Sequence, residues 1–180
     1  MHLSKNFYII SGGPGSGKTS LLQALAQQGI PCMPEAGRAI IQDQLAIGGS
    51  ALPWANKTAF ADLMLSWDIR SFRDAQALTG PVLFDRGIPD VMGYLLLSNL
   101  PVPAPLEKAV HTFRYNQRVF LAPPWPEIYT RDTERKQSPE EAIATFSTLS
   151  ELYKNLGYET LNLPLVPVGE RVQFVLTHLS

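Results

Sequence analysis

A glycine-rich stretch near the N-terminus has the residue types and spacing of a phosphate-binding loop. Residues 11–19 read Ser-Gly-Gly-Pro-Gly-Ser-Gly-Lys-Thr and fit the pattern G-x-x-x-x-G-K-[ST]. An apolar run over 7–10 precedes the stretch and residues with helical spacing follow it, which is the context in which this pattern binds phosphate. The backbone N–H groups of such a loop point at one anion, and the following helix adds the positive end of its dipole. The stretch predicts a site for a nucleoside triphosphate with Mg²⁺.

Two side chains of this loop have expected roles of their own. We expect Lys18 to reach the β- and γ-phosphates from an exposed position, and the Thr19 hydroxyl to enter the Mg²⁺ shell. The alternative is a glycine-rich turn without a ligand. The residues expected to bind the nucleotide are Gly12, Gly13, Pro14, Gly15, Ser16, Gly17, Lys18, Thr19 and Ser20.

An acidic and a basic residue follow a second apolar run, 82–84. A carboxylate at the carboxyl end of a buried strand can hold Mg²⁺ directly or through water, so we expect Asp85 to be a metal ligand. The charge of Arg86 could bridge donor and acceptor phosphates. An ordinary strand-end acid and a surface salt bridge remain the alternatives. Asp90, in the first turn of the next helix, fits a structural role and a functional one equally well.

Three more charged residues are candidates for the chemistry. Glu35 could be the base for an acceptor hydroxyl, because phosphoryl transfer needs an oriented nucleophile. A helix N-terminal carboxylate is the alternative, and Arg38 could contact an anion or pair with Glu35. Arg131 and Arg135 lie in an irregular segment, about 123–137, where a lid could bring positive charge onto the transferring group and exclude water. An ordinary solvated loop would explain the same residues.

Strand patterns alternate with helical patterns along the chain, which predicts an α/β fold with a five-stranded parallel sheet covered on both faces. The expected strands are 7–11, 30–34, 82–84, 118–122 and 158–163, and the expected helices are 18–28, 36–47, about 56–78, 89–98, about 105–116, 138–157 and about 169–179. Ligands of such sheets bind at the carboxyl ends of the strands. At 180 residues we expect a single domain over 1–180 with a lid-like segment.

Composition limits the classes of partner. The chain has 15 basic and 16 acidic residues, and this balance favours a small-molecule partner over nucleic acid or anionic lipid. A single cysteine, Cys32, cannot form an internal disulfide and fits a reducing compartment. The chain has no apolar run of membrane-spanning length, and we expect no signal peptide before the first strand because residues 1–6 carry no apolar core of adequate length. We expect a cytoplasmic protein without a nucleic-acid or membrane partner.

The phosphate loop and three further motifs together resemble the AAA ATPase-like family of predicted ATPases. The motifs are Pro34-Glu35-Ala36-Gly37-Arg38, Leu52-Pro53-Trp54 and Phe84-Asp85-Arg86-Gly87-Ile88-Pro89-Asp90. The resemblance covers nearly the whole chain, and the family is similar to the nucleoside- and nucleotide-kinase branch of P-loop proteins. It implies a P-loop NTPase three-layer sandwich that uses ATP and Mg²⁺. The chain is too short for the helical lid domain of a hexameric motor.

Deoxynucleoside kinases, which the chain resembles more distantly, imply roles for the charged residues. In them a glutamate after the second strand is the base, which corresponds to Glu35. An acid–arginine pair after the third strand contacts phosphate and metal, which corresponds to Asp85 and Arg86, and the lid arginines correspond to Arg131 and Arg135. Those kinases usually carry glutamate where Asp85 stands, and the shorter side chain would hold Mg²⁺ instead of touching a substrate hydroxyl.

Three functions remain open from the sequence. The favoured one is an ATP- and Mg²⁺-dependent phosphotransferase acting on a small molecule, a nucleoside or a nucleotide. The second is a regulatory ATPase whose only acceptor is water. The third, a GTP-dependent switch, is disfavoured because Asn56-Lys57-Thr58-Ala59 lacks the aspartate that would read guanine. The identity of the acceptor does not follow from spacing.

Overall fold

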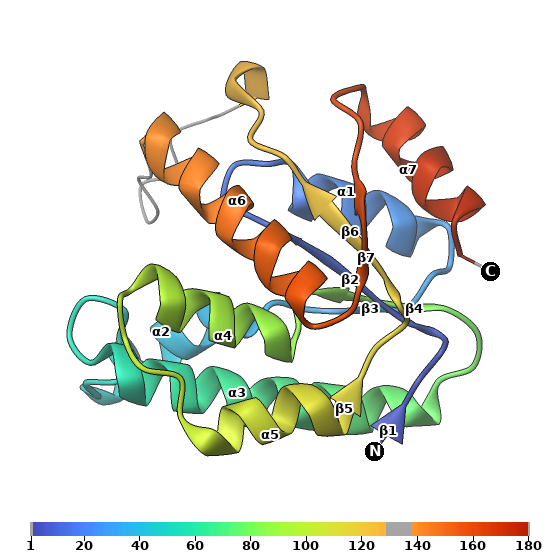
Figure 1. Cartoon of the computed structure of the whole chain (residues 1–180). Coiled ribbons are helices and arrows are strands. Elements are labelled where there is room, and N and C mark those ends of the chain that lie inside the picture. The colour runs from blue at the N-terminus through green and yellow to red at the C-terminus, as the bar shows by residue number, and fades with distance from the viewer. Residues whose placement is uncertain (1, 129–137, 180) are drawn as a thin grey trace.

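Five parallel strands form the central sheet of the computed structural model, which describes residues 2–128 and 138–179 (Figure 1). Their order across the sheet is β3 (Cys32–Met33), β4 (Val82–Asp85), β2 (Phe7–Gly12), β6 (Arg118–Ala122) and β7 (Glu159–Asn162). In the register, Ile10 of β2 lies opposite Asp85 on one side and Phe120 on the other. The loops that leave β2, β4 and β6 therefore start at one edge of the sheet. This confirms the parallel α/β fold expected from the sequence.

Two helical layers cover the two faces of the sheet (Figure 1). Helices α1 (Lys18–Gln27) and α7 (Val168–Thr177) lie on one face. The other face carries α3 (Lys57–Asp74), α4 (Ile88–Leu97), α5 (Ala104–Thr112) and α6 (Pro139–Asn155). Helix α2 (Ala36–Ile47) packs on α3 through a cluster that includes Ile40 and Phe60. Short 3₁₀ turns occupy Ala75–Ala77 and Pro126–Ile128.

The core follows the alternation of side chains along the strands. Phe7 and Ile9 of β2 belong to the apolar cluster under α3–α6, whereas Tyr8 and Ile10 belong to the cluster under α1 and α7. All four are buried, as expected for a central strand that is covered on both sides. This burial fixes β2 and so fixes the loop that follows it.

Local signals in the sequence set several helix ends where they were expected. Helix α2 ends at Gly48, whose φ of 67° is in the left-handed region. Helix α6 begins with the expected capping box: the Glu141 amide donates to Ser138 Oγ at 3.2 Å, and the Ser138 amide donates to the Glu141 carboxylate at 2.7 Å. No helix within 2–128 or 138–179 has the length and apolar character needed to cross a membrane.

A second, two-stranded sheet was not expected. It pairs β1 (His2–Leu3) in parallel with β5 (Phe113–Arg114), where the sequence pattern predicted that a helix would run to about residue 116. Phe113 and Tyr115 are both buried against Phe72, at ring-centroid distances of 5.5 and 5.1 Å. Alternate residues reach one side in an extended chain but not in a helix, so these contacts end α5 at Thr112.

Candidate functional site

The glycine-rich loop joins the central strand β2 to α1 at the carboxyl edge of the sheet. Two glycines are required by its geometry. Gly12 has a φ of 141°, and a Cβ atom there would lie 2.6 Å from the carbonyl oxygen of Ala122 on β6. Gly17, which caps α1, has a φ of 78°, and a Cβ atom there would lie 2.7 Å from Arg171 Nη1. Because these two residues have no side chain, the loop can lie close to both β6 and α7.

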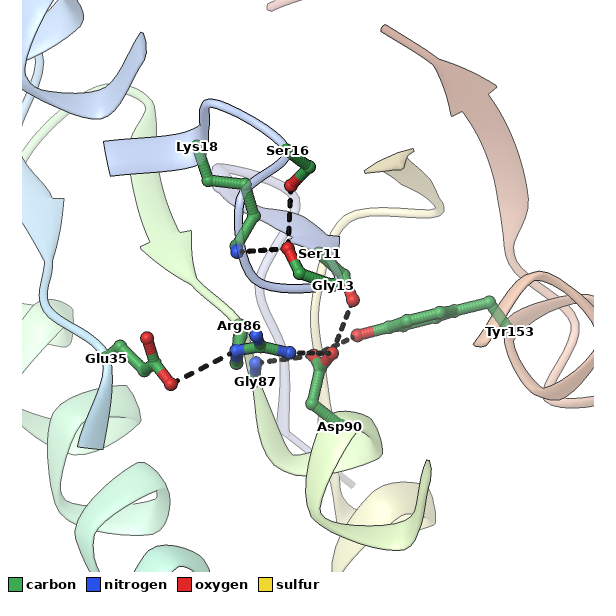
Figure 2. Close-up of polar contacts among 9 residues, drawn as sticks. All are labelled: Ser11, Gly13, Ser16, Lys18, Glu35, Arg86, Gly87, Asp90 and Tyr153. Atoms are coloured by element: carbon green, nitrogen blue, oxygen red, sulfur yellow. Dashed lines mark hydrogen bonds and ion pairs between the residues drawn. The ribbon is translucent and has the colours of Figure 1, made fainter. Parts of the chain in front are cut away.

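Lys18 is buried, with 7% of its surface exposed, so the expectation of an exposed lysine was wrong. Its Nζ atom donates to the carbonyl oxygen of Gly13 at 3.3 Å, and Ser16 Oγ donates to the same oxygen at 2.8 Å (Figure 2). Burial, with a smaller effect of Arg86, lowers the pKa of Lys18 to about 8 against the opposing influence of nearby carboxylates. A desolvated ammonium of this kind is strongly stabilised by an incoming anion.

Asp85 and Thr19 are the candidate metal ligands. Asp85 ends β4 beside the central strand, and its Oδ1 atom is buried without a hydrogen-bond partner in the part of the chain that the structure describes. Burial raises the pKa of Asp85, and Lys18 partly offsets that effect. Thr19 and Ser20 are exposed in the first turn of α1. A carboxylate oxygen without a partner and a hydroxyl are ligands that suit Mg²⁺, which takes few protein ligands and completes its shell with phosphate and water.

Arg86 and Glu35 form an ion pair beside the loop. Arg86 Nε lies 3.3 Å from Glu35 Oε1, and Nη1 lies 3.9 Å from Asp90 Oδ1 (Figure 2). Burial alone would lower the pKa of Arg86, but the carboxylates of Glu35, Asp90 and Asp85 together raise it. The φ of Arg86 is 71°, which is rare for a residue with a side chain other than Asn or Asp. The structure thus brings Glu35 and Arg86 together from two different strand ends.

Asp90 connects the parts of this site. Its carboxylate accepts hydrogen bonds from Ser11 Oγ, from the Gly87 amide at 2.9 Å and from Tyr153 Oη at 2.6 Å (Figure 2). The residue is 7% exposed. These bonds tie the end of β2, the start of α4 and the last turn of α6 to one carboxylate, which also faces Arg86. Asp90 therefore holds these elements together beside Arg86, a structural arrangement that its sequence position did not predict.

A cavity of about 400 Å³ opens next to Glu35 and Arg86. Most of its lining is apolar, with a few polar and charged side chains, as expected for a small-molecule site. The lining residues are Pro14, Glu35, Ala36, Gly37, Ile41, Pro53, Trp54, Phe60, Met64, Asp68, Arg86, Asp90, Val91, Tyr94, Leu97, Thr145 and Leu149. Pro14 of the glycine-rich loop belongs to this set, so the cavity lies beside the phosphate-binding loop.

Two functional candidates in the structure were missed by the sequence analysis. Asp68 lies in the middle of α3 and lines the cavity; burial, and then Asp90 and Glu35, raise its pKa well above the usual range. Arg171 on α7 is 2% exposed, and its Nη1 atom donates to the Ser16 carbonyl oxygen at 3.0 Å. The guanidinium of Arg171 also lies over the ring of Trp125 at 5.4 Å. The only sequence signal for Asp68 was an acid within an apolar helical stretch, and Arg171 had none.

Of the expected lid segment, about 123–137, the structure describes residues 123–128. Pro126–Ile128 form a 3₁₀ turn after β6, and Trp125 contacts Arg171. Arg131 and Arg135 lie outside the described residues, so their proposed roles stay predictions.

Several solved structures have folds similar to that of this chain, and most of them are kinases according to their titles. Deoxyadenosine kinase from M. mycoides, with dCMP and dCDP bound, is 13% identical, with 96% of this chain and 98% of that chain covered and a TM-score of 0.64. Thymidylate kinase from Ehrlichia chaffeensis is 12% identical, with 98% of each chain covered and a TM-score of 0.63. NadR protein in complex with NR is 17% identical, with 97% of this chain but 50% of that chain covered and a TM-score of 0.74.

These likenesses show that the fold is that of P-loop kinases. No curated protein sequence matches the chain. A family model described as "AAA domain" matches residues 7–171, from the central strand to the buried arginine of α7. That span includes the glycine-rich loop, the Glu35–Arg86 pair and the cavity, and the chain belongs to this AAA domain family.

Proposed function

We propose that this chain is an ATP- and Mg²⁺-dependent phosphotransferase that acts on the hydroxyl of a small molecule of the nucleoside or nucleotide class. The observation that carries the proposal is the position of the Glu35–Arg86 pair, which lines a cavity shared with Pro14 of the phosphate-binding loop. A protein that only hydrolyses ATP needs room for water beside the γ-phosphate. Here the adjoining cavity of about 400 Å³ has the size of a small-molecule site.

The loop and its lysine account for the donor side of the reaction. The amides of residues 12–19 would surround the β- and γ-phosphates, and the buried ammonium of Lys18 would offset their charge as the nucleotide displaces its contact with Gly13. Asp85 and Thr19 would hold Mg²⁺, which when bound neutralises negative charge on the phosphate oxygens. The similar fold of the kinases named above supports ATP as the donor.

Glu35 and Arg86 account for the acceptor side. A hydroxyl placed between Glu35 and the γ-phosphate would form the new O–P bond while the bond from the γ-phosphorus to the β–γ bridging oxygen breaks. Glu35 would take the hydroxyl proton, and ADP would leave with the electron pair of the broken bond. Arg86, held by Glu35 and Asp90, would stabilise charge on the transferred group. Its raised pKa keeps the guanidinium charged throughout.

Glu35→Gln tests this proposal, because the amide keeps the size of the side chain and removes the proton acceptor. Nucleosides, nucleoside monophosphates and ribosylated pyridines would be screened as acceptors by mass detection of the phosphorylated product. We expect Glu35→Gln to lower product formation about 10²- to 10⁴-fold and to leave Mg·ATP binding intact. Glu107→Gln, an exposed change on α5, is the matched control and should have no effect.

The contrary outcome favours the second function. If no compound stimulates ATP consumption and Glu35→Gln hydrolyses ATP as the wild type does, Glu35 is a helix-start carboxylate. The chain would then be a regulatory ATPase.

A further inference from the structure

We propose that the cavity binds an unphosphorylated ring compound without negative charge, such as a nucleoside or a ribosylated pyridine, and not a nucleoside monophosphate. Asp68 is assigned as the residue that recognises a hydrogen-bond donor or a positive charge on this compound. The inference rests on the proposed function, because it names the substrate class for the same site. Binding of the compound can nevertheless be measured without its turnover.

The charges that line the cavity are the first argument. Among the described residues, the charged side chains that line the cavity are three acids, Glu35, Asp68 and Asp90, and one base, Arg86. The base is already paired with Glu35 at 3.3 Å and faces Asp90 at 3.9 Å. Guanidinium and ammonium groups are the side chains that bind a phosphate monoester most strongly, because they bond its oxygens and offset their charge. Among the described residues that line this cavity, no other basic side chain is available, so a second phosphate would meet net negative charge.

Asp68 is the second argument. Its carboxyl lines the cavity and makes no hydrogen bond or ion pair with any residue within 2–128 or 138–179. Burial and the neighbouring acids raise its pKa, which means that the folded chain opposes its ionisation. An acid in such a place costs stability unless it has a partner. A hydroxyl, an amine or a cationic ring of a bound compound would be that partner.

The remaining walls are the third argument. Three aromatic side chains, Trp54, Phe60 and Tyr94, line the cavity together with aliphatic ones. Phe60 and Tyr94 pack edge to face with centroids 5.6 Å apart, whereas Trp54 is 64% exposed. Aromatic faces attract flat rings and especially cationic ones. Apolar and aromatic walls with a few acids therefore suit a flat ring joined to a hydroxyl-bearing part.

Equilibrium binding tests the ligand class without turnover. Titration calorimetry with the full chain and Mg·ADP would compare nucleosides and a ribosylated pyridine with their own 5′-monophosphates, and Mg·ADP binding would be measured separately. We expect at least one unphosphorylated compound to bind about 100-fold more tightly than its monophosphate. Equal or tighter binding of the monophosphate would overturn the inference, and so would failure of every unphosphorylated compound to bind. A compound that binds but is not phosphorylated would contradict the proposed function and leave the ligand class standing.

Asp68→Asn tests the assigned residue, with Asp62→Asn as the matched control because Asp62 is an exposed acid on the same helix. We expect Asp68→Asn to weaken binding of the unphosphorylated ligand about 10- to 100-fold, because a neutral amide oxygen replaces a carboxylate oxygen as the acceptor. The ratio between the affinities for the unphosphorylated compound and for its monophosphate should become smaller in Asp68→Asn. Asp62→Asn should have the affinities of the wild type. Asp68→Ala is the second variant, and unchanged Mg·ADP binding shows that each variant is folded. Wild-type ligand affinity in both Asp68 variants would overturn the assignment.

Discussion

The charge state of Lys18 should control the affinity of the loop for a triphosphate. Burial and Arg86 bring the pKa of Lys18 to about 8 in the free protein, and a bound triphosphate would raise it again. Binding above pH 8 must therefore include uptake of a proton. We predict that Mg·ATP affinity is level below pH 8 and falls by up to about tenfold per pH unit above it.

Titration calorimetry between pH 7 and pH 9.5 measures this dependence. Lys18→Arg keeps a positive charge over the whole pH range, so the affinity of this variant for Mg·ATP should change little with pH. Lys18→Ala should weaken binding about 10- to 100-fold at pH 7. Wild-type affinity that stays constant up to pH 9.5 would contradict the assigned role of Lys18.

Asp68 should cost the folded protein stability at neutral pH. The pKa of Asp68 in the folded state is well above the ordinary value of 3.8. Between pH 3.8 and this raised pKa, the folded chain therefore holds more protons than the unfolded chain. The free energy of unfolding therefore decreases as the pH rises through this range. We predict that Asp68→Asn raises the free energy of unfolding at pH 7 by on the order of 1 kcal/mol and makes its pH dependence shallower.

Urea denaturation at pH 4.5 and pH 7.5 measures both effects. Asp62→Asn should leave stability nearly unchanged because Asp62 is exposed. A loss of stability in Asp68→Asn at pH 7 would mean that the carboxyl has a structural partner.

At the scale of elements, the sequence predicted what depends on local patterns. The glycine-rich loop, β6 and the start of α6 follow from spacing and capping signals over a few residues. Helix α5 was predicted four residues too long because its end depends on contacts of Phe113 and Tyr115 with Phe72, about 40 residues away in the sequence.

The functional candidates divide in the same way. Glu35 and Asp85 could be proposed from the sequence because Asp85 ends a recognisable strand and Glu35 follows one. Asp68 and Arg171 were not, because their significance arises from tertiary contacts; the bond from Arg171 to Ser16 joins residues 155 positions apart. Such contacts leave no periodic signal in a single sequence.

Helix α7 supports the loop through Arg171. Its Nη1 atom donates to the Ser16 carbonyl oxygen, while its Nε and Nη2 atoms are buried without hydrogen-bond partners in the described part of the chain. We predict that Arg171→Met lowers Mg·ATP affinity about tenfold, because the loop loses a charge-assisted bond. Hydrogen exchange should increase in residues 12–20. Arg70→Met is the matched control, since Arg70 is an exposed arginine on α3.

Partial recovery in Arg171→Lys would support a role for the charge. Wild-type affinity and exchange in Arg171→Met would show that α7 only covers the sheet.

The segment after β6 is the expected lid. If Arg131 and Arg135 act on developing charge in the transition state, replacing both with alanine should lower turnover by on the order of 10³-fold and change Mg·ATP affinity little. Steady-state kinetics with calorimetry separate the two quantities. Lys108→Ala, an exposed change on α5, is the control. Full activity of the double variant would make 123–137 an ordinary loop.

At the scale of the whole molecule, the sheet separates two halves of the site. The phosphate-binding loop continues into α1, which packs with α7 on one face, and the cavity is lined by residues of α2, α3, α4 and α6 on the other. The parallel register brings the ends of β2 and β4 to one edge between these layers (Figure 1). A donor held on one side and an acceptor on the other would meet at Glu35, Arg86 and Lys18.

The fate of the γ-phosphoryl group of ATP tests this account most directly. The wild-type chain would be incubated with Mg²⁺, γ-labelled ATP and an unphosphorylated compound that binds the cavity, and the label would be followed into acceptor and into inorganic phosphate. We predict that label appears on the acceptor in step with ADP and that ATP without acceptor is consumed slowly. Label found only in inorganic phosphate, at a rate that the compound does not change, would contradict phosphoryl transfer by this site.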